Sequence, residues 1–405
     1  MVSHFASVKA RLQPGRALPA LYPEEFKSVL SRAAGREALE TISAWHGYAE
    51  TPLVALDRLA RETGVARLFY KQEADRFGLG SFKALGGAYA VYRLLAAEVE
   101  ARTGEQPSPA GILSGRYADI VSSVTVTCAT DGNHGRSVAW GARMFGCQSV
   151  IFLHETVSQG RQDAIAAYGA RIMRARGNYD DSVREAARVA GENGWRVVSD
   201  TSYPGYTDVP RNVMQGYSVM VDEAQRQLGA LRPTHVFIQG GVGGLAAAVT
   251  AHFWEGLGHE RPKVIVVEPD KAACLLESAA AGKPTAVAGD LDTIMAGLAC
   301  GEPSIIAWPI LESGASAFMS VPDETALDVM RLLASGEAGA RLVAGESAVA
   351  GLAGFLVAAA RPEWRTALGI DESSVVVFFG SEGDTDPELY KEIVGKSGAE
   401  VRAQQ

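Results

Sequence analysis

The sequence predicts an α/β protein built on parallel sheets, and two observations support this prediction. Short β-branched and aromatic runs alternate along the chain with helix-like segments, which is the pattern of parallel strands joined by covering helices. Glycine-rich turns follow two of these runs, and in open sheets of this kind ligands bind beyond the carboxyl ends of the strands. The predicted strands span residues 67–70, 149–153, 171–174, 196–199, 236–238, 264–267 and 375–379.

The composition is that of a globular protein with well-buried cores. Of 405 residues, 47% are hydrophobic and 21% are charged, and a chain of this length can form two or three domains. The formal net charge of −9 argues against a nucleic-acid or anionic-membrane partner, because both require a basic face. No targeting segment and no uninterrupted apolar stretch of about 18 residues is seen, so we expect a cytoplasmic location.

The cysteines and histidines do not predict a metal site. Cys128, Cys147, Cys274 and Cys300 show neither metal-ligand spacing nor a secreted disulfide framework. The histidines other than His134 also lack ligand spacing. Cys274 and Cys300 flank a Gly/Ala/Pro-rich segment, 279–290, so a bridge between these two stays open.

Lys83 lies among small residues at the predicted start of a helix, in Gly80-Ser-Phe-Lys-Ala-Leu-Gly-Gly-Ala88. A lysine amine attacks a carbonyl when it is held in place and its pKa is lowered by desolvation or by a neighbouring cation. Taken alone, a lysine in the first turn of a helix is usually a solvated charge. The catalytic interpretation therefore depends on two further segments.

Two turns, each between a strand-like and a helix-like run, can bind anions. The first is Thr130-Asp-Gly-Asn-His-Gly135 and the second is Gln239-Gly-Gly-Val-Gly-Gly-Leu245. A strand-turn-helix unit directs backbone N–H groups at an anion, and the glycines allow close approach to a phosphate.

The second turn also fits a different class of ligand. Residues 241–246 match the Gly-x-Gly-x-x-Ala form of a dinucleotide fingerprint, and Glu268 ends the next strand-like run. A nucleotide-dependent oxidoreductase is therefore an alternative, although it explains neither Lys83 nor the turn at 130–135. A monophosphate site needs only the glycines.

Together these segments resemble the fold-type II pyridoxal-phosphate enzymes, the family of threonine and serine dehydratases, cysteine synthases and the tryptophan synthase β chain. The resemblance covers nearly the whole chain, including the C-terminal run that ends in Gly380-Ser-Glu-Gly-Asp384. Within the family the chain most resembles the diaminopropionate ammonia-lyases. The residues that carry this closer resemblance are 82–90, 129–136, 293–303 and 382–387.

The resemblance implies two parallel-sheet, three-layer αβα domains with pyridoxal 5'-phosphate in the cleft between them. The large domain would comprise residues 1–92 and 207–405, and the smaller inserted domain residues 93–206. Proline and glycine residues near 104–115 and 204–216 indicate loops or interdomain segments. The family resemblance also implies a homodimer.

The resemblance assigns a cofactor contact to each matching residue. Lys83 would carry the cofactor as a Schiff base, Phe82 would pack on its ring, and Asn133 would hydrogen-bond its phenolic oxygen. Ser381 would meet the pyridine nitrogen, with Thr385 as the alternative. Such a hydroxyl leaves the nitrogen largely unprotonated and favours β-elimination. The phosphate would be held by Gly240, Gly241, Gly243 and Gly244.

Asp131 is the departure that predicts the substrate. Dehydratases of the wider family usually carry a small neutral residue here, in a turn whose N–H groups, at Thr130 to Gly132, would cradle the substrate α-carboxylate. An added anion suits a substrate with a second ammonium group on Cβ. It could also accept the Cα proton from the face opposite Lys83, so we expect elimination of ammonia from both L- and D-2,3-diaminopropionate, giving pyruvate and two ammonia.

Three further residues have less specific expectations. His134 is expected to orient the turn rather than act as a base. Asp200 follows a strand-like run and is equally a catalytic carboxylate near the cleft or a cap or turn acid. Glu346 resembles a position that supports the active site or a cation.

Two alternative functions remain. A serine or threonine dehydratase is the alternative within the family, and an inactive pyridoxal-phosphate sensor is the alternative outside catalysis.

Overall fold

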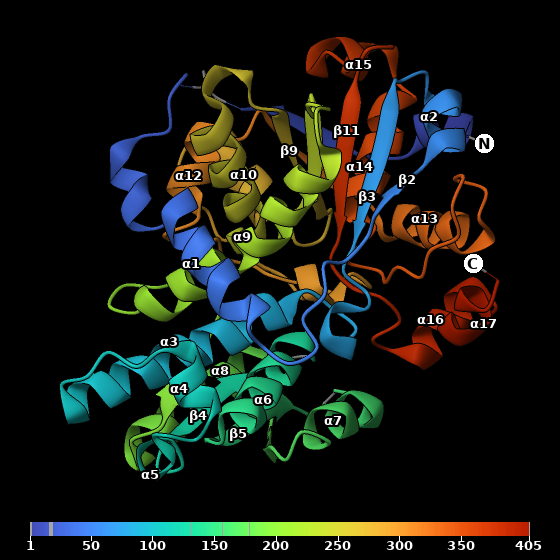
Figure 1. Cartoon of the computed structure of the whole chain (residues 1–405). Coiled ribbons are helices and arrows are strands. Elements are labelled where there is room, and N and C mark those ends of the chain that lie inside the picture. The colour runs from blue at the N-terminus through green and yellow to red at the C-terminus, as the bar shows by residue number, and fades with distance from the viewer. Residues whose placement is uncertain (1, 16–18, 131, 156, 178, 405) are drawn as a thin grey trace. The chain divides into compact units, whose positions relative to one another are not determined.

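The computed structural model describes residues 2–15, 19–130, 132–155, 157–177 and 179–404. The chain divides into two compact units, each with its own sheet (Figure 1). Unit 1 comprises residues 1–32, 50–75 and 220–405, and unit 2 comprises residues 33–49 and 76–219. The predicted inserted domain, 93–206, lies within unit 2, and its proposed edges stay a prediction.

Unit 1 contains a seven-stranded sheet in the order β1-β10-β9-β8-β11-β3-β2. The five central strands run parallel, and the edge strands β1 and β2 pair antiparallel to their neighbours. Strands β8, β10 and β11 are buried throughout, as expected for a parallel sheet covered on both faces. The strands are β1 (Arg11–Pro14), β2 (Leu53–Ala55), β3 (Arg67–Gln72), β8 (His235–Gln239), β9 (Lys263–Pro269), β10 (Ala317–Val321) and β11 (Val375–Gly380).

The helices of unit 1 pack around this sheet. The segment Ala350–Ala358 of α14 is buried, as is the segment Gly244–Trp254 of α10, so both helices form part of the core rather than its solvent-facing cover. The α-helices are α2 (Asp57–Thr63), α10 (Gly244–Leu257), α11 (Cys274–Ala281), α12 (Trp308–Gly314), α13 (Asp323–Ser335), α14 (Ala350–Ala359), α15 (Pro362–Leu368), α16 (Pro387–Val394) and α17 (Gly398–Arg402). The short 3-10 helices are η1 (Val2–Ser7), η2 (Glu24–Ser28), η4 (Gly258–Glu260) and η5 (Ala296–Leu298).

Unit 2 contains a four-stranded sheet in the order β6-β5-β4-β7, and all three strand pairs are parallel. Its strands are β4 (Thr125–Ala129), β5 (Gln148–His154), β6 (Arg171–Ala175) and β7 (Arg196–Val197). Its helical segments are α1 (Arg32–Ser43), η3 (Arg76–Gly78), α3 (Lys83–Thr103), α4 (Pro109–Leu113), α5 (Ala118–Val121), α6 (Asn133–Phe145), α7 (Gln159–Ala166), α8 (Tyr179–Asn193) and the first part of α9 (Asp208–Leu228).

Helix α3 packs closely on α6 and α9 because small residues lie at the contacts. A Cβ atom on Gly141 of α6 would lie 2.9 Å from the Cα atom of Ala88. A Cβ atom on Gly216 of α9 would lie 1.9 Å from the carbonyl oxygen of Leu85. These contacts hold the beginning of α3 against two neighbouring helices.

The predicted α/β architecture is confirmed, and each of the seven predicted strands coincides with an observed one, although 196–199 forms a strand only over Arg196–Val197. The strand-like run ahead of Thr130 is β4, and β1, β2 and β10 were not predicted. The prediction of a loop or interdomain segment across 204–216 was wrong from Asp208 onward, where α9 begins. Pro210 lies in the first turn, where its missing N–H removes no helical hydrogen bond, and Gly216 is required by the contact with α3.

In the described part of the chain, no helix is both long enough and apolar enough to cross a membrane.

Candidate active site

Lys83 is the first residue of α3, and its amine is paired with a carboxylate of the same unit. Gly80, with φ of 78°, turns the chain ahead of the helix. The Lys83 Nζ atom lies 2.7 Å from the Oδ2 atom of Asp200, and the two side chains are 20% and 22% exposed. Lys83 therefore combines a fixed position with limited contact with solvent, which a lysine nucleophile requires.

Asp200 is held as a carboxylate by its neighbours. Burial alone would raise its pKa, but the Lys83 ammonium, His134 and hydrogen bonds from Lys83 and its own backbone outweigh burial and keep the pKa below its usual range. The structure thus brings Lys83 and Asp200 together from positions 117 residues apart. Among the described helices none is capped by Asp200, whose carboxylate bonds Lys83 and its own backbone.

His134 lies beside this pair with a defined orientation. Its Nε2 atom is 2.7 Å from the carbonyl oxygen of Val198. Since a carbonyl only accepts, Nε2 must carry the proton and Nδ1 the lone pair of the neutral ring. Burial lowers the pKa of His134, and Nδ1 lies 3.9 Å from Asp200 Oδ2 without a hydrogen-bond partner. The hydrogen bond to Val198 is consistent with the orienting role expected of His134, which stays a prediction.

Tyr217 was missed by the sequence analysis. Its ring centroid lies 4.5 Å from that of Phe82 and 5.9 Å from Lys83 Nζ, which is also 5.4 Å from the Phe82 centroid. Burial raises the pKa of Tyr217 to about 12, so it is a neutral phenol. The adjacent Gly216 was the available signal, because small residues on two helices permit the close packing that brings this ring to Lys83.

The turn at 130–135 leads from β4 into α6. The Thr130 hydroxyl accepts from the N–H groups of Gly132 and Gly135, at 3.0 and 3.1 Å, and the Thr130 N–H donates to Phe152 O. The N–H groups of Thr130 and Gly132 thus bind protein acceptors, and their predicted role toward a substrate carboxylate stays a prediction. Asn133 is the first residue of α6, and Asp131 lies outside the described residues.

In unit 1, the glycine loop leads from β8 into α10. Gly241 and Gly243 have φ of 64° and 98°, which favours glycine over any residue with a side chain. Gly243 caps α10, whose first backbone N–H groups have no intrahelical acceptor. A Cβ atom on Gly240 would lie 2.6 Å from Glu268 Cγ. The loop is therefore a bare backbone cradle at the positive end of a 14-residue helix, which suits a phosphate.

The burial of Glu268 argues against a dinucleotide as the ligand of this loop. Its carboxylate accepts from the N–H groups of Leu275 and Leu276, at 2.9 and 2.8 Å, and the side chain is fully buried. Burial raises its pKa to about 8. An acid that binds a ribose must be accessible, whereas Glu268 is enclosed at the beginning of α11.

The Ser381 hydroxyl, the predicted partner of the pyridine nitrogen, directly follows β11. Ser381 is 5% exposed, and its Oγ atom lies 2.8 Å from the Nε2 atom of Gln239. Thr385 lies further along the same segment, and its N–H donates to Gly383 O.

Glu346 is buried in a segment held by Glu382, which accepts from the N–H groups of Gly345 and Ser347.

Among the described residues, the cysteines form no disulfide and the acidic groups form no metal site. Cys274 and Cys300 are both thiols in the structure, so the bridge that the sequence left open is not formed. Among the residues described, no cluster of three or more His, Cys, Asp or Glu side chains is arranged to hold a metal ion.

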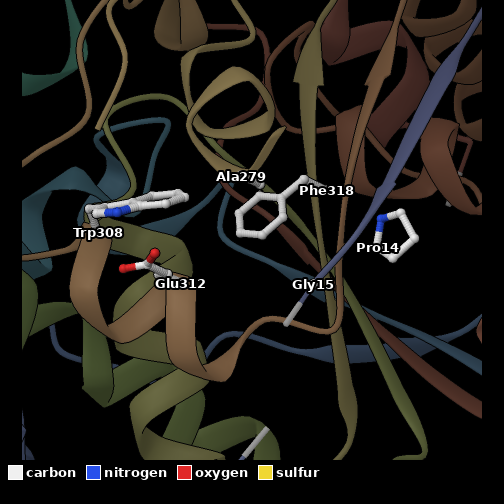
Figure 2. Close-up of a pocket in the computed structure, with 6 residues that line it drawn as sticks. All are labelled: Pro14, Gly15, Ala279, Trp308, Glu312 and Phe318. Atoms are coloured by element: carbon white, nitrogen blue, oxygen red, sulfur yellow. The ribbon is translucent and has the colours of Figure 1, made fainter. Parts of the chain in front are cut away.

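Two cavities are lined by none of the predicted site residues. One, in unit 1, lies between β1, β10, α11 and α12 and is lined by Trp308, Glu312 and Phe318 among others (Figure 2). Its volume of about 10 Å³ is enough for one water molecule at most. The other, in unit 2, has a volume of about 240 Å³ and is lined by Trp140, Arg143, Met144 and Tyr168.

Comparison with known proteins assigns nearly the whole chain to one enzyme family. Residues 44–380 match the model of the "Pyridoxal-phosphate dependent enzyme" family. The diaminopropionate ammonia-lyase of Escherichia coli K12 is 40% identical over 380 residues, which covers 91% of this chain and 93% of that protein.

Solved structures of the Escherichia coli diaminopropionate ammonia lyase are also similar. The complex with D-serine matches with a TM-score of 0.87 and 35% identity, and the complex with an aminoacrylate-PLP azomethine reaction intermediate matches with a TM-score of 0.85 and 35% identity. Each comparison covers 96% of this chain and 97% of the other.

Proposed function

Because the chain belongs to the diaminopropionate ammonia-lyase family of pyridoxal-phosphate dependent enzymes, we propose that it catalyses the α,β-elimination of 2,3-diaminopropionate to pyruvate and two molecules of ammonia. The similarity at 40% identity over 91% of the chain carries this proposal. The Lys83–Asp200 pair and the glycine loop support it independently, because they are the parts that such a reaction needs.

The described residues fit pyridoxal 5'-phosphate. Gly240, Gly241, Gly243 and Gly244 form a turn of bare backbone, in which a Cβ atom on Gly240 would meet Glu268 and one on Gly243 would meet Leu311. Ser381 offers a hydroxyl at the end of β11. Lys83 would hold the cofactor, with Phe82 packed on its ring and Asn133 on its phenolic oxygen. Bound pyridoxal phosphate would withdraw electrons from the carbon that loses its proton.

Lys83 and Asp200 would handle the protons of the reaction. Lys83 would take the Cα proton of the L isomer at Nζ. Asp200, at 2.7 Å from that atom, would stabilise the ammonium that results and direct it. The departing β-amine must be protonated, and the Lys83 ammonium is a donor for it. His134 would orient the turn at 130–135 through its hydrogen bond to the Val198 carbonyl oxygen.

Asp131 would decide the choice of substrate. Its carboxylate would attract the β-ammonium group of 2,3-diaminopropionate and would take the Cα proton of the D isomer. Thr130, Gly132 and His134 would frame the substrate in the same turn. These roles rest on the sequence, because Asp131 lies outside the described residues.

We also propose a homodimer in the cytoplasm. The dimer rests on the family resemblance. The compartment is supported by the four cysteines, which are thiols, as expected where thiols are kept reduced. Sedimentation equilibrium would test the dimer, and a monomer at micromolar concentration would contradict it.

A serine or threonine dehydratase is the second candidate, because the same lysine, phosphate loop and hydroxyl would serve it. The purified protein should absorb visible light from its bound cofactor. Pyruvate formation should then be measured with L- and D-2,3-diaminopropionate, serine and threonine side by side. Faster turnover of serine or threonine would replace the proposed substrate, and a protein that neither purifies with nor takes up the cofactor would refute the proposal altogether.

A further inference from the structure

The side-chain amide of Gln239 joins the ends of two neighbouring strands. Gln239 is the last residue of β8, and Ser381 directly follows β11, which runs parallel to β8. The Gln239 Nε2 atom lies 2.8 Å from the carbonyl oxygen of Phe379 and 2.8 Å from Ser381 Oγ. Gln239 is 2% exposed, so water does not compete for these bonds.

The orientation of this amide is determined by its partners. A backbone carbonyl only accepts hydrogen bonds, so the amide atom that faces Phe379 O must be the nitrogen. The flipped amide would place two oxygen atoms 2.8 Å apart with no proton between them. One proton of the NH₂ group therefore goes to Phe379 O, and the other goes to Ser381 Oγ.

This bond determines what Ser381 offers to a ligand. A hydroxyl has one proton, and Ser381 Oγ already accepts from Gln239. Across the described residues, the Ser381 proton has no protein acceptor. A buried hydroxyl proton without an acceptor is unfavourable, so Ser381 is set to donate to a ligand atom that carries a lone pair.

The side-chain oxygen of Gln239 indicates that this residue does more than fill space in the core. The Gln239 Oε1 atom is buried and has no hydrogen-bond partner. An apolar side chain of similar size would avoid that cost, and buried unpartnered polar atoms in folded proteins call for a specific explanation. The hydrogen bonds that the NH₂ group donates supply that explanation.

We propose that Gln239 is a positioning residue that orients the Ser381 hydroxyl as a donor and so commits the site to a cofactor whose ring nitrogen is unprotonated. The inference rests on the proposed pyridoxal-phosphate function. An unprotonated pyridine nitrogen accepts the Ser381 proton. A pyridinium would instead donate to Ser381 and leave the hydroxyl proton without an acceptor.

Two substitutions separate this role from a structural one. In Gln239→Glu the new side chain is a buried carboxylic acid whose single proton goes to Phe379 O. Its oxygen atoms then accept the Ser381 proton, so Ser381 turns its lone pairs to the ring nitrogen and stabilises the protonated ring. In Gln239→Met the orienting bond is lost without a new acceptor at that position. The pH at which the ring nitrogen takes up a proton should therefore rise in both variants, and by more in Gln239→Glu.

The experiment measures that nitrogen directly. Holoenzyme is reconstituted with pyridoxal 5'-phosphate labelled with ¹⁵N in the ring, and the ¹⁵N resonance is followed from about pH 4 to about pH 9. The wild type should show a neutral nitrogen above about pH 6, and Gln239→Glu should raise the protonation midpoint by at least about one unit, a tenfold change in the proton equilibrium. Gln225→Glu, which makes the same substitution elsewhere in unit 1, should behave as the wild type.

Each result distinguishes the two proposals. A wild-type resonance of a protonated ring, or wild-type midpoints in both Gln239 variants that have bound cofactor, would overturn the role of Gln239 and leave the proposed function standing. A wild-type protein that binds no cofactor would instead refute the proposed function. If Gln239→Glu does not fold, the midpoint of Gln239→Met alone decides the question.

Discussion

Replacing Lys83 with methionine should raise the pKa of Asp200 in the protein without cofactor. Burial favours the protonated form of this carboxyl, and the Lys83 ammonium opposes burial both through its charge and through its hydrogen bond. Methionine has nearly the length of lysine but carries no charge. Without the ammonium, the effect of burial is less strongly opposed, so the pKa of Asp200 must rise.

The distance between Lys83 Nζ and Asp200 Oδ2, 2.7 Å, sets the magnitude. At an effective dielectric constant of about 20, two unit charges at that separation attract each other by roughly 6 kcal/mol. Solvent screens part of this, because the side chains are 20% and 22% exposed. A hydrogen bond to a charged group is worth about 1.5–3 kcal/mol, which corresponds to a rise of about one to two pKa units.

The ¹³C resonance of the Asp200 carboxyl, assigned by its loss in Asp200→Asn, measures this pKa in an acid titration. Stability gives a second measure. A depressed carboxyl pKa stabilises the fold above the pKa of the unfolded chain, about 3.9, and this contribution is lost as the pH falls through the folded-state pKa. The difference in unfolding free energy between wild type and Lys83→Met should therefore shrink as the pH falls below about 4.

Lys27→Met is the matched control, because Lys27 pairs with Glu24 on the surface of unit 1. It should leave the titration of Asp200 unchanged. If Asp200 titrates at the same pH in wild type and Lys83→Met, the Lys83 ammonium does not set its ionisation, and our account of the pair is wrong.

Three further substitutions, one of them with a matched control, test other parts of the protein. Gly243→Val should weaken cofactor retention, because φ is 98° there and a Cβ atom would lie 3.0 Å from Leu311; an unchanged dissociation constant would mean that the phosphate binds elsewhere. Gly216→Ala should destabilise the protein by about 1–3 kcal/mol or more through overpacking against Leu85. Gly191→Ala in α8, with nothing within 4 Å of the new Cβ atom, should be neutral or stabilising in the same denaturation assay. Asp131→Asn should lower turnover of D-2,3-diaminopropionate by roughly 10² and that of the L isomer less; equal small losses would exclude a stereospecific base.

Local pattern in the sequence was enough to predict the parallel sheets, the helix that begins at Lys83 and the two anion-binding turns. These features depend on residues within a few positions of one another, such as the alternation of strands with helices and the glycines that precede α10. Two of the three missed strands could not be predicted in this way. Strands β1 and β2 have only four and three residues, too short for a periodic pattern, and they are ordered by hydrogen bonds to distant partners.

The relations among the site residues were decided by the tertiary structure. The Lys83–Asp200 pair joins residues 117 apart, and the Gln239–Ser381 bond joins residues 142 apart. The sequence left Asp200 equally a cap or a catalytic acid and offered Glu268 as a ribose ligand. Packing placed the first beside the amine and enclosed the second at a helix N-terminus. Residue type limits what a side chain can do, but its ionisation and its hydrogen-bond direction depend on neighbours that only folding supplies.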